Sequence, residues 1–113
     1  MDTLQILVIL GIFALGLLIS IVIFGRTDTY TTISKKAAGD CIALCQELKS
    51  NGASLSKGPC LSNKIIDDWA CDVAHYPREF SDDALENQCI SMIEGSAHHF
   101  IEVDSDCKLI RVY

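Results

Sequence analysis

The chain has 113 residues, with 15 acidic and 9 basic side chains and a formal net charge of −6. Between Asp67 and Asp106 there are 11 acidic residues and a single basic residue, Arg78. Such a surface repels phosphate backbones, so the composition predicts no nucleic-acid partner. The length allows one small domain beside one membrane-spanning segment.

The N-terminal segment Leu4–Phe24 contains 21 residues and no charged side chain. As an α-helix it would be about 32 Å long, which matches a hydrocarbon core of about 30 Å. A cleavable signal peptide has a shorter apolar region and a small-residue cleavage site, whereas this run ends in SIVIFGRT. A helix that is apolar on every face is rarely the core of so small a protein. We therefore predict a retained transmembrane helix within residues 1–26, and a membrane as the first partner.

Small residues interrupt this apolar segment. Gly16 and Ser20 form a small-x-x-x-small pair, and Gly11 and Ala14 lie one or two turns earlier. Small side chains let helix backbones approach closely in a membrane, although Gly and Ala are also common there without that role. We predict that the helix packs against other helices through these four residues.

A second, amphipathic helix is expected after the apolar one. Gly25, Arg26 and the run TDTYTT indicate a break or a loosened turn, and Thr31 or Thr32 is suited to cap a new helix. Apolar residues then recur at three- and four-residue steps: Ile33, Ala37, Cys41, Leu44, Cys45 and Leu48. Gly52 suits the left-handed position that ends such a helix.

All six cysteines lie within residues 27–113, which we predict to form a disulfide-rich head. They are Cys41, Cys45, Cys60, Cys71, Cys89 and Cys107. An even number in a small, loop-rich domain indicates a disulfide framework and therefore an extracytoplasmic location. Zinc sites usually pair ligands at short spacings, which only Cys41 and Cys45 approach. These two lie one helical turn apart and are each expected to bond a different partner, but the sequence does not choose among the possible pairings.

Two hairpins are expected in the remainder of the chain. Cys60–Ile66 and Trp69–Val73 flank a pair of aspartates, and His98–Val103 and Cys107–Tyr113 flank the turn DSD. Adjacent residues of a strand point to opposite faces. In the third strand, the face with His99, Ile101 and Val103 is the more apolar one and is expected to turn inward.

The segment between the hairpins is acidic and irregular. Within it, DALENQCISMI predicts a short helix with Leu85, Cys89 and Met92 facing inward, ended by Gly95. Arg78, in HYPRE, is expected to form an internal ion pair rather than to bind a substrate. The predicted fold class is α+β: a transmembrane helix continuing into an amphipathic helix, then a small disulfide-stapled antiparallel β-sheet.

The sequence contains no catalytic signature. It has no G-x-S-x-G, no H-E-x-x-H and no glycine-rich phosphate loop. His98 and His99 point to opposite faces of a strand, so they do not bind one metal together, although His75 could join one of them. The aspartates of residues 81–83 and 104–106 suit turn hydrogen bonds and lack the ligand spacing of an EF-hand. We predict no enzymatic activity, no cofactor and no metal.

A hydrophobic N-terminal helix that continues into an amphipathic helix and a small disulfide-bonded sheet resembles the type IV pilin and pseudopilin architecture. The strings GPCLSNKI, WACDVAHYPRE, ENQC and HHFIEVDSDCKLI are also similar to small archaeal exported proteins with class III, pilin-type signal sequences. The resemblance implies an archaeal, structural cell-surface protein. Mature pilins have lost a basic leader, which would account for the acidic start of this chain. They usually carry Glu at the fifth position, where this chain has Gln5.

Two signals disagree about the side on which the head lies. Arg26, Lys35 and Lys36 follow the apolar helix and nothing basic precedes it, which by the positive-inside rule places the head in the cytoplasm. The six cysteines place it outside. We follow the cysteines, because three nearby bases orient a helix only weakly.

Three functions are consistent with the sequence. The first is a pilin-like surface subunit that assembles with copies of itself or with related subunits through the apolar helix. The second is a single-pass accessory subunit of a larger archaeal membrane complex, with the head capping its outer face. The third is a metal- or redox-active binding module that uses His75, His98 or His99.

Overall fold

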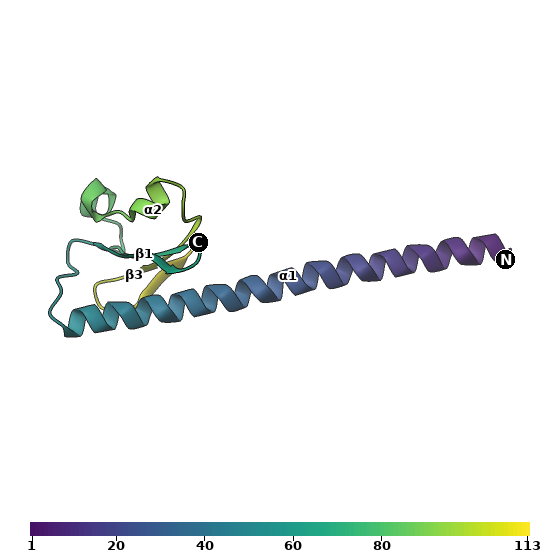
Figure 1. Cartoon of the computed structure of the whole chain (residues 1–113), viewed down its shortest axis with the longest axis horizontal. Coiled ribbons are helices and arrows are strands. Elements are labelled where there is room, and N and C mark those ends of the chain that lie inside the picture. The colour runs from purple at the N-terminus through teal and green to yellow at the C-terminus, as the bar shows by residue number, and fades with distance from the viewer. The chain divides into compact units, whose positions relative to one another are not determined.

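The computed structural model describes the whole chain, residues 1–113, and its longest element is one helix, α1 (Figure 1). In chain order the elements are α1 (Thr3–Ser50), β1 (Cys60–Ile66), β2 (Trp69–Val73), η1 (Phe80–Asp83), η2 (Leu85–Asn87), α2 (Ile90–Ile93), β3 (His99–Val103) and β4 (Leu109–Val112). The chain divides into two compact units, Met1–Ile33 and Ser34–Tyr113. The second unit contains all six cysteines and the whole sheet; it starts at Ser34 rather than at the expected residue 27, and it is called the head below.

Helix α1 is continuous through TDTYTT, so the predicted break and the predicted N-cap at Thr31 or Thr32 are wrong. Threonine hydroxyls in this run donate to backbone carbonyl oxygens one turn earlier. These bonds join Thr27 to Phe24 (2.8 Å), Thr29 to Gly25 (3.0 Å), Thr31 to Thr27 (2.9 Å) and Thr32 to Asp28 (2.9 Å). Because such bonds satisfy the hydroxyls inside a helix, the polar run does not end it.

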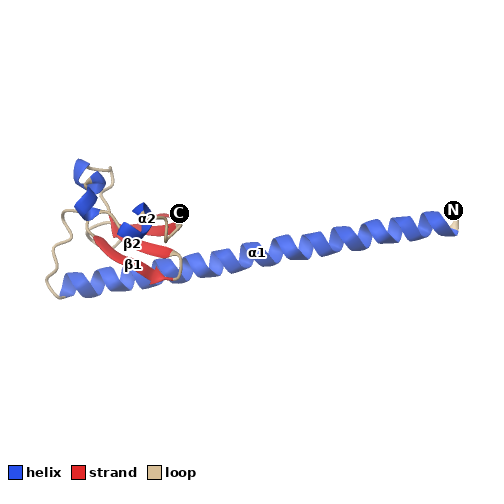
Figure 2. Ribbon diagram, turned by 45° about the horizontal axis from the view of Figure 1, so that its top comes forward, coloured by secondary structure: helices blue, strands red, loops and turns tan.

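Within the head, the last turns of α1 cover one face of the sheet (Figure 2). Ala37, Cys41 and Cys45 are completely buried there, at the four-residue spacing of the predicted amphipathic stripe. Their buried neighbours in the core include Trp69, Cys71, Val73, Ile101 and Val103. Helix α1 ends at Ser50. Gly52, just beyond it, has the predicted left-handed conformation, with a φ of 86°, and the next N–H, of Ala53, donates to the Leu48 carbonyl oxygen (2.9 Å).

The four strands form one mixed sheet in the order β1-β2-β3-β4. The pairs β1–β2 and β3–β4 are antiparallel, which confirms both predicted hairpins. The central pair β2–β3 is parallel, with Trp69 opposite His99 and Val73 opposite Val103. The predicted fully antiparallel sheet is therefore wrong. Parallel neighbours require a crossover connection, and residues 74–98, called the crossover below, supply it with η1, η2 and α2.

The crossover packs on the face of the sheet opposite α1, where Ala70, Cys89 and Ala97 form a second buried cluster. Its helical part is divided into η2 and α2 rather than forming one helix. Cys89 is buried as predicted, but Leu85 is 71% exposed, so its predicted inward position is wrong. Gln88 and Cys89 are extended between the two short helices, which places Cys89 over β1 for its disulfide.

The structure pairs all six cysteines, as the sequence predicted. The bonds are Cys41–Cys71, Cys45–Cys107 and Cys60–Cys89. The first two join α1 to β2 and to the β3–β4 connection, and the third joins β1 to the crossover. Each layer of the head is therefore covalently attached to the sheet.

Candidate functional site

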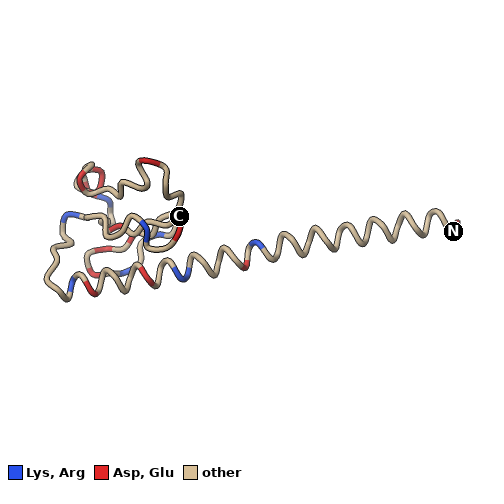
Figure 3. Tube along the Cα trace, in the orientation of Figure 1, with Lys and Arg blue, Asp and Glu red and all other residues tan.

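The first candidate site is the apolar surface of α1 within Met1–Ile33. Every residue of Leu4–Phe24 is exposed, and α1 is long and apolar enough to cross a membrane. Figure 3 shows that the charged residues of the chain lie outside this stretch. Water does not solvate so large an apolar surface favourably. The helix therefore suits a lipid bilayer or a bundle of other helices.

The four predicted packing residues lie on two faces of this helix. At about 100° per residue, Gly16 and Ser20 share one face, and Gly11 and Ala14 lie on roughly the opposite side. A Cβ atom at Gly11 or Gly16 would meet nothing within 4 Å. The Ser20 hydroxyl donates to the Gly16 carbonyl oxygen (3.0 Å), so it is satisfied within the helix. Each face allows close approach by another backbone.

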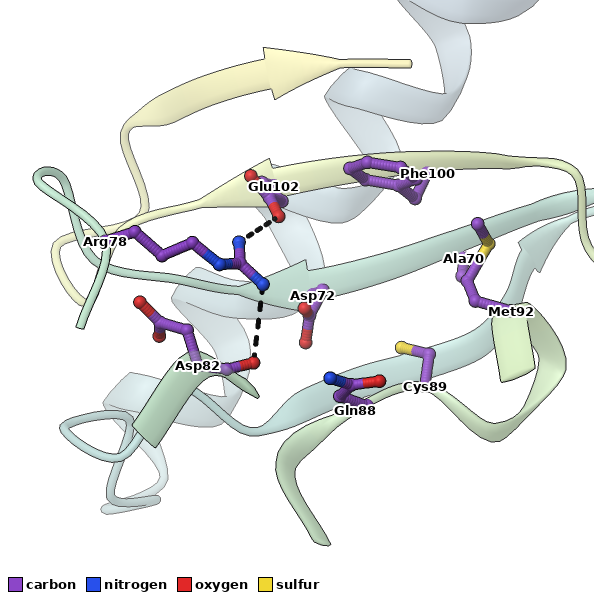
Figure 4. Close-up of a pocket in the computed structure, with 9 residues that line it drawn as sticks. All are labelled: Ala70, Asp72, Arg78, Asp82, Gln88, Cys89, Met92, Phe100 and Glu102. Atoms are coloured by element: carbon purple, nitrogen blue, oxygen red, sulfur yellow. Dashed lines mark hydrogen bonds and ion pairs between the residues drawn. The ribbon is translucent and has the colours of Figure 1, made fainter. Parts of the chain in front are cut away.

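The second candidate site is a cavity of about 170 Å³ in the head, between the sheet and the crossover (Figure 4). Its polar lining comes from β2, β3 and the crossover: Asp72, Arg78, Asp82, Gln88 and Glu102. Cys89, Met92 and Phe100 supply the apolar part. Three carboxyl groups thus face one small volume, and each has a different environment.

Glu102 is held between two arginines. The Arg78 guanidinium donates to Oε1 (3.2 Å) and the Arg111 guanidinium donates to Oε2 (2.8 Å). Glu102 is 5% exposed, because the crossover covers its side of β3. This is the face of the strand that we expected to be the less apolar of the two. Arg78 also donates to Asp83 (3.0 Å), so it forms the predicted internal ion pair, with partners other than its neighbour Glu79.

Asp72 has a carboxyl oxygen without a hydrogen-bond partner. Its Oδ1 atom is buried and accepts no bond. Burial, reinforced by the negative charge of Glu102, raises the pKa of Asp72 to about 8, because the ionised form loses its hydration. A carboxyl oxygen of Asp72 and the Sγ atoms of Cys60 and Cys89 all lie within 4.8 Å of one another. Since the two sulfurs are bonded to each other, the group is a disulfide beside a neutral carboxyl.

Asp82 organises the first turn of the crossover. Its carboxylate accepts hydrogen bonds from the His75 backbone N–H (3.0 Å), from the Glu79 backbone N–H (2.9 Å) and from the His75 ring at Nδ1 (2.8 Å). The other ring nitrogen of His75 donates to the Ser56 carbonyl oxygen (3.0 Å). Both partners of the ring are acceptors, which favours the protonated imidazole.

The hydrogen bond between His75 and Asp82 acts to raise the pKa of His75 and to lower that of Asp82. Burial acts to raise the pKa of Asp82, but the hydrogen bonds from Glu79 and His75 outweigh it and hold that pKa below its ordinary value. The two groups therefore form a structural ion pair that fixes the crossover to the loop before β1.

The other two histidines are gathered at the opposite end of β2. The imidazole of His98 pairs with Asp68 in the β1–β2 turn, and His99 Nε2 lies 3.8 Å from the same carboxylate. The His99 ring also stacks on Trp69, with centroids 4.6 Å apart. His75 has other partners, so the structure does not bring the three histidines together.

The aspartates of the β3–β4 turn form turn hydrogen bonds, as the sequence predicted. Asp104 Oδ1 accepts from the backbone N–H groups of Asp106 and Lys108, each at 2.9 Å. Asp106 pairs with Lys49 at the end of α1 (2.7 Å). A hydrogen bond from Lys49 lowers the pKa of Asp106. This turn is thereby fixed to the helix beside the Cys45–Cys107 disulfide.

These features define a class of protein: an α+β chain with one helix able to cross a membrane and a head closed by three disulfides. The helix suggests a single-pass membrane protein, and the disulfides fit an extracytoplasmic head. Comparisons with family models, with curated proteins and with solved structures find no match to this chain.

Proposed function

We propose that this protein is a structural, pilin-like cell-surface subunit that assembles through the apolar part of α1 and displays its disulfide-bonded head. The observation that carries the proposal is the apolar segment with small residues on two opposite faces. A helix that serves only as an anchor requires length and apolar character, but no small residues.

Two faces for close approach favour a repeating assembly over a single pair. A contact that joins one face of a helix to a different face of the next helix is heterologous. Such contacts form a filament when the rotation that relates neighbouring subunits does not close into a ring. Gly16 and Ser20 would supply one side of that contact, and Gly11 and Ala14 the other. The pilin resemblance points to the same arrangement.

The head suits display outside the cell. Its buried core is small, and most of the side chains in it come from α1, β2 and β3. Disulfides supply stability that so small a core lacks, chiefly by restricting the unfolded chain. Three bridges would keep the domain folded where no cytoplasmic chaperone acts on it.

Isoleucine substitutions at the two faces test this proposal. Gly16→Ile and Gly11→Ile each place a branched side chain at a close contact, which we expect to weaken association by about 1–3 kcal/mol. Self-association of the full chain in mild detergent is measured by sedimentation equilibrium. The matched control is Leu17→Ile, which conserves volume and is expected to leave association unchanged.

The pattern of losses distinguishes the kinds of assembly. Losses at both glycines support a repeating assembly, whereas a loss at Gly16 alone indicates a pair joined through one face. Association that survives both glycine substitutions would contradict a role for this helix in self-assembly. Retention of unrelated membrane subunits would instead favour an accessory subunit of a larger complex.

A further inference from the structure

We propose that the Cys60–Cys89 disulfide is a thiol–disulfide exchange site that reacts with small thiols, and that Asp72 is its proton donor. This activity goes beyond the structural role proposed above and does not depend on assembly. Three observations support it: the partial exposure of Cys60, the position of the Asp72 carboxyl group and the burial of Cys89.

The three disulfides differ in access. Cys41, Cys71 and Cys45 are completely buried, and Cys107 is 4% exposed. Cys60 is only half-buried, and Cys89 lines the cavity of the head. Because exchange begins with a thiolate reaching a disulfide sulfur, the structure offers Cys60 for attack and protects the other two bridges.

Asp72 is placed to serve the leaving sulfur. It pairs with Cys60 across the β1–β2 ladder, and its carboxyl lies within 4.8 Å of both sulfurs. Figure 4 shows Asp72 and Cys89 projecting toward one another in the cavity. The buried Oδ1 atom has no hydrogen-bond partner, so no protein group competes for its proton.

Burial, reinforced by the charges around the cavity, keeps this carboxyl protonated. Glu102 from β3 and Asp82 from the crossover both oppose a further negative charge. Arg78 is the one basic group that favours ionisation of Asp72, and its guanidinium is already bound to Glu102 and Asp83. Burial raises the pKa of Asp72 to about 8 together with these charges, so the proton is present at neutral pH.

The exchange step balances with a thiol as the co-reactant. A thiolate RS⁻ attacks Sγ of Cys60, the bond to Cys89 breaks, and Cys89 takes the electron pair and the proton of Asp72. The products are the mixed disulfide Cys60–S–S–R, the Cys89 thiol and the Asp72 carboxylate, so the single negative charge is conserved. A second thiolate then attacks the RS sulfur and releases RSSR, and Cys60 takes its proton from solvent. The thiols are oxidised and the protein disulfide is reduced.

The proton donor matters because of where Cys89 lies. Cys89 is 3% exposed, so a thiolate formed there would be poorly hydrated, and the cavity that it lines also contains the negatively charged Glu102. Burying an unpaired charge costs several kcal/mol. Transfer of the proton during bond cleavage avoids a thiolate at Cys89 and leaves the charge on the Asp72 carboxylate, where the positive charge of Arg78 partly offsets it.

The test follows reduction of the full chain in detergent by dithiothreitol, with alkylation and mass spectrometry to locate each new thiol. We expect Cys60 and Cys89 to be labelled first. Asp72→Asn, which has the shape and neutrality of the protonated acid, should slow their labelling by about 100-fold per thiolate, the low end for a positioned acid. Asp67→Asn alters a carboxyl that is 93% exposed, and it should leave the rate unchanged.

The pH profile of the unmodified protein gives an independent readout. Expressed per attacking thiolate, its rate should fall as pH rises through about 8, because Asp72 then loses its proton. Reduction of all three disulfides together, or an Asp72→Asn rate equal to that of the wild type, would overturn the proposal. So would a rate per thiolate that does not fall across this pH range, and this measurement needs no variant to fold.

Discussion

At the scale of single residues, Gly58 determines how closely the crossover can approach the loop before β1. Its φ of +73° is left-handed, and a Cβ atom there would lie 2.6 Å from Asp82 Oδ1 and 3.0 Å from the Val73 carbonyl oxygen. The Asp82 carboxylate is fixed by its bonds to His75 and Glu79. It cannot move away without losing them.

We therefore predict that Gly58→Ala destabilises the head by more than the cost of a left-handed alanine. That cost alone is about 1–2 kcal/mol, and Gly95→Ala is the matched control, since Gly95 has a φ of +75° and nothing within 4 Å of its Cβ position. Urea unfolding followed by the fluorescence of the single, buried Trp69 measures both variants. Equal losses of unfolding free energy would show that the contact with Asp82 is unimportant.

At the scale of elements, the two hairpins were predictable and the crossover was not. The strands Cys60–Ile66 and Trp69–Val73 end where the sequence placed them, because their turn is local and Asp68 takes the left-handed conformation it requires. The parallel pairing of β2 with β3 depends on how residues 74–98 cross the sheet. No local pattern encodes that path.

The two candidate sites differ in the same way, because one depends on local sequence and the other on the path of the crossover. The apolar helix and its small residues can be identified from the sequence, because composition and length are enough to recognise such a segment. The site at Asp72 was missed because it exists only once the crossover covers the second face of β2. The one available signal was an acidic residue inside the apolar strand WACDV.

The disulfides give a prediction at this scale, because they close loops of different length. The sequence separations are 62 for Cys45–Cys107 and 29 for Cys60–Cys89. By loop-closure entropy these bridges contribute about 4.3 and about 3.6 kcal/mol, respectively. Replacing Cys45 and Cys107 together with Ser should thus destabilise the head more, and buried hydroxyls in the α1 core add to the loss.

Urea unfolding of the two double variants tests this order, with Trp69 again as the reporter. The variant with Ser at positions 60 and 89 is the comparison, because its bridge lies at the edge of the core rather than beneath α1. A larger loss for that variant would contradict the importance of the Cys45–Cys107 loop.

At the scale of the whole molecule, the chain combines a segment that water does not solvate with a head that is acidic and covalently closed. Of the residues from Asp67 to Asp106, 11 are acidic, so heads displayed side by side would repel one another at low ionic strength. In the proposed assembly, attraction between copies would then come from the apolar helices. Assembly is accordingly expected to strengthen as salt screens the heads.

Imaging of native assemblies tests whether copies of this protein associate through the apolar helix. The full chain is extracted in mild detergent at moderate ionic strength, and the particles are examined by electron microscopy. We expect multi-copy fibres or bundles with the α1 helices packed inside and the heads outside. Monomeric particles in detergent, together with no copies of the protein in surface fibres, would contradict it.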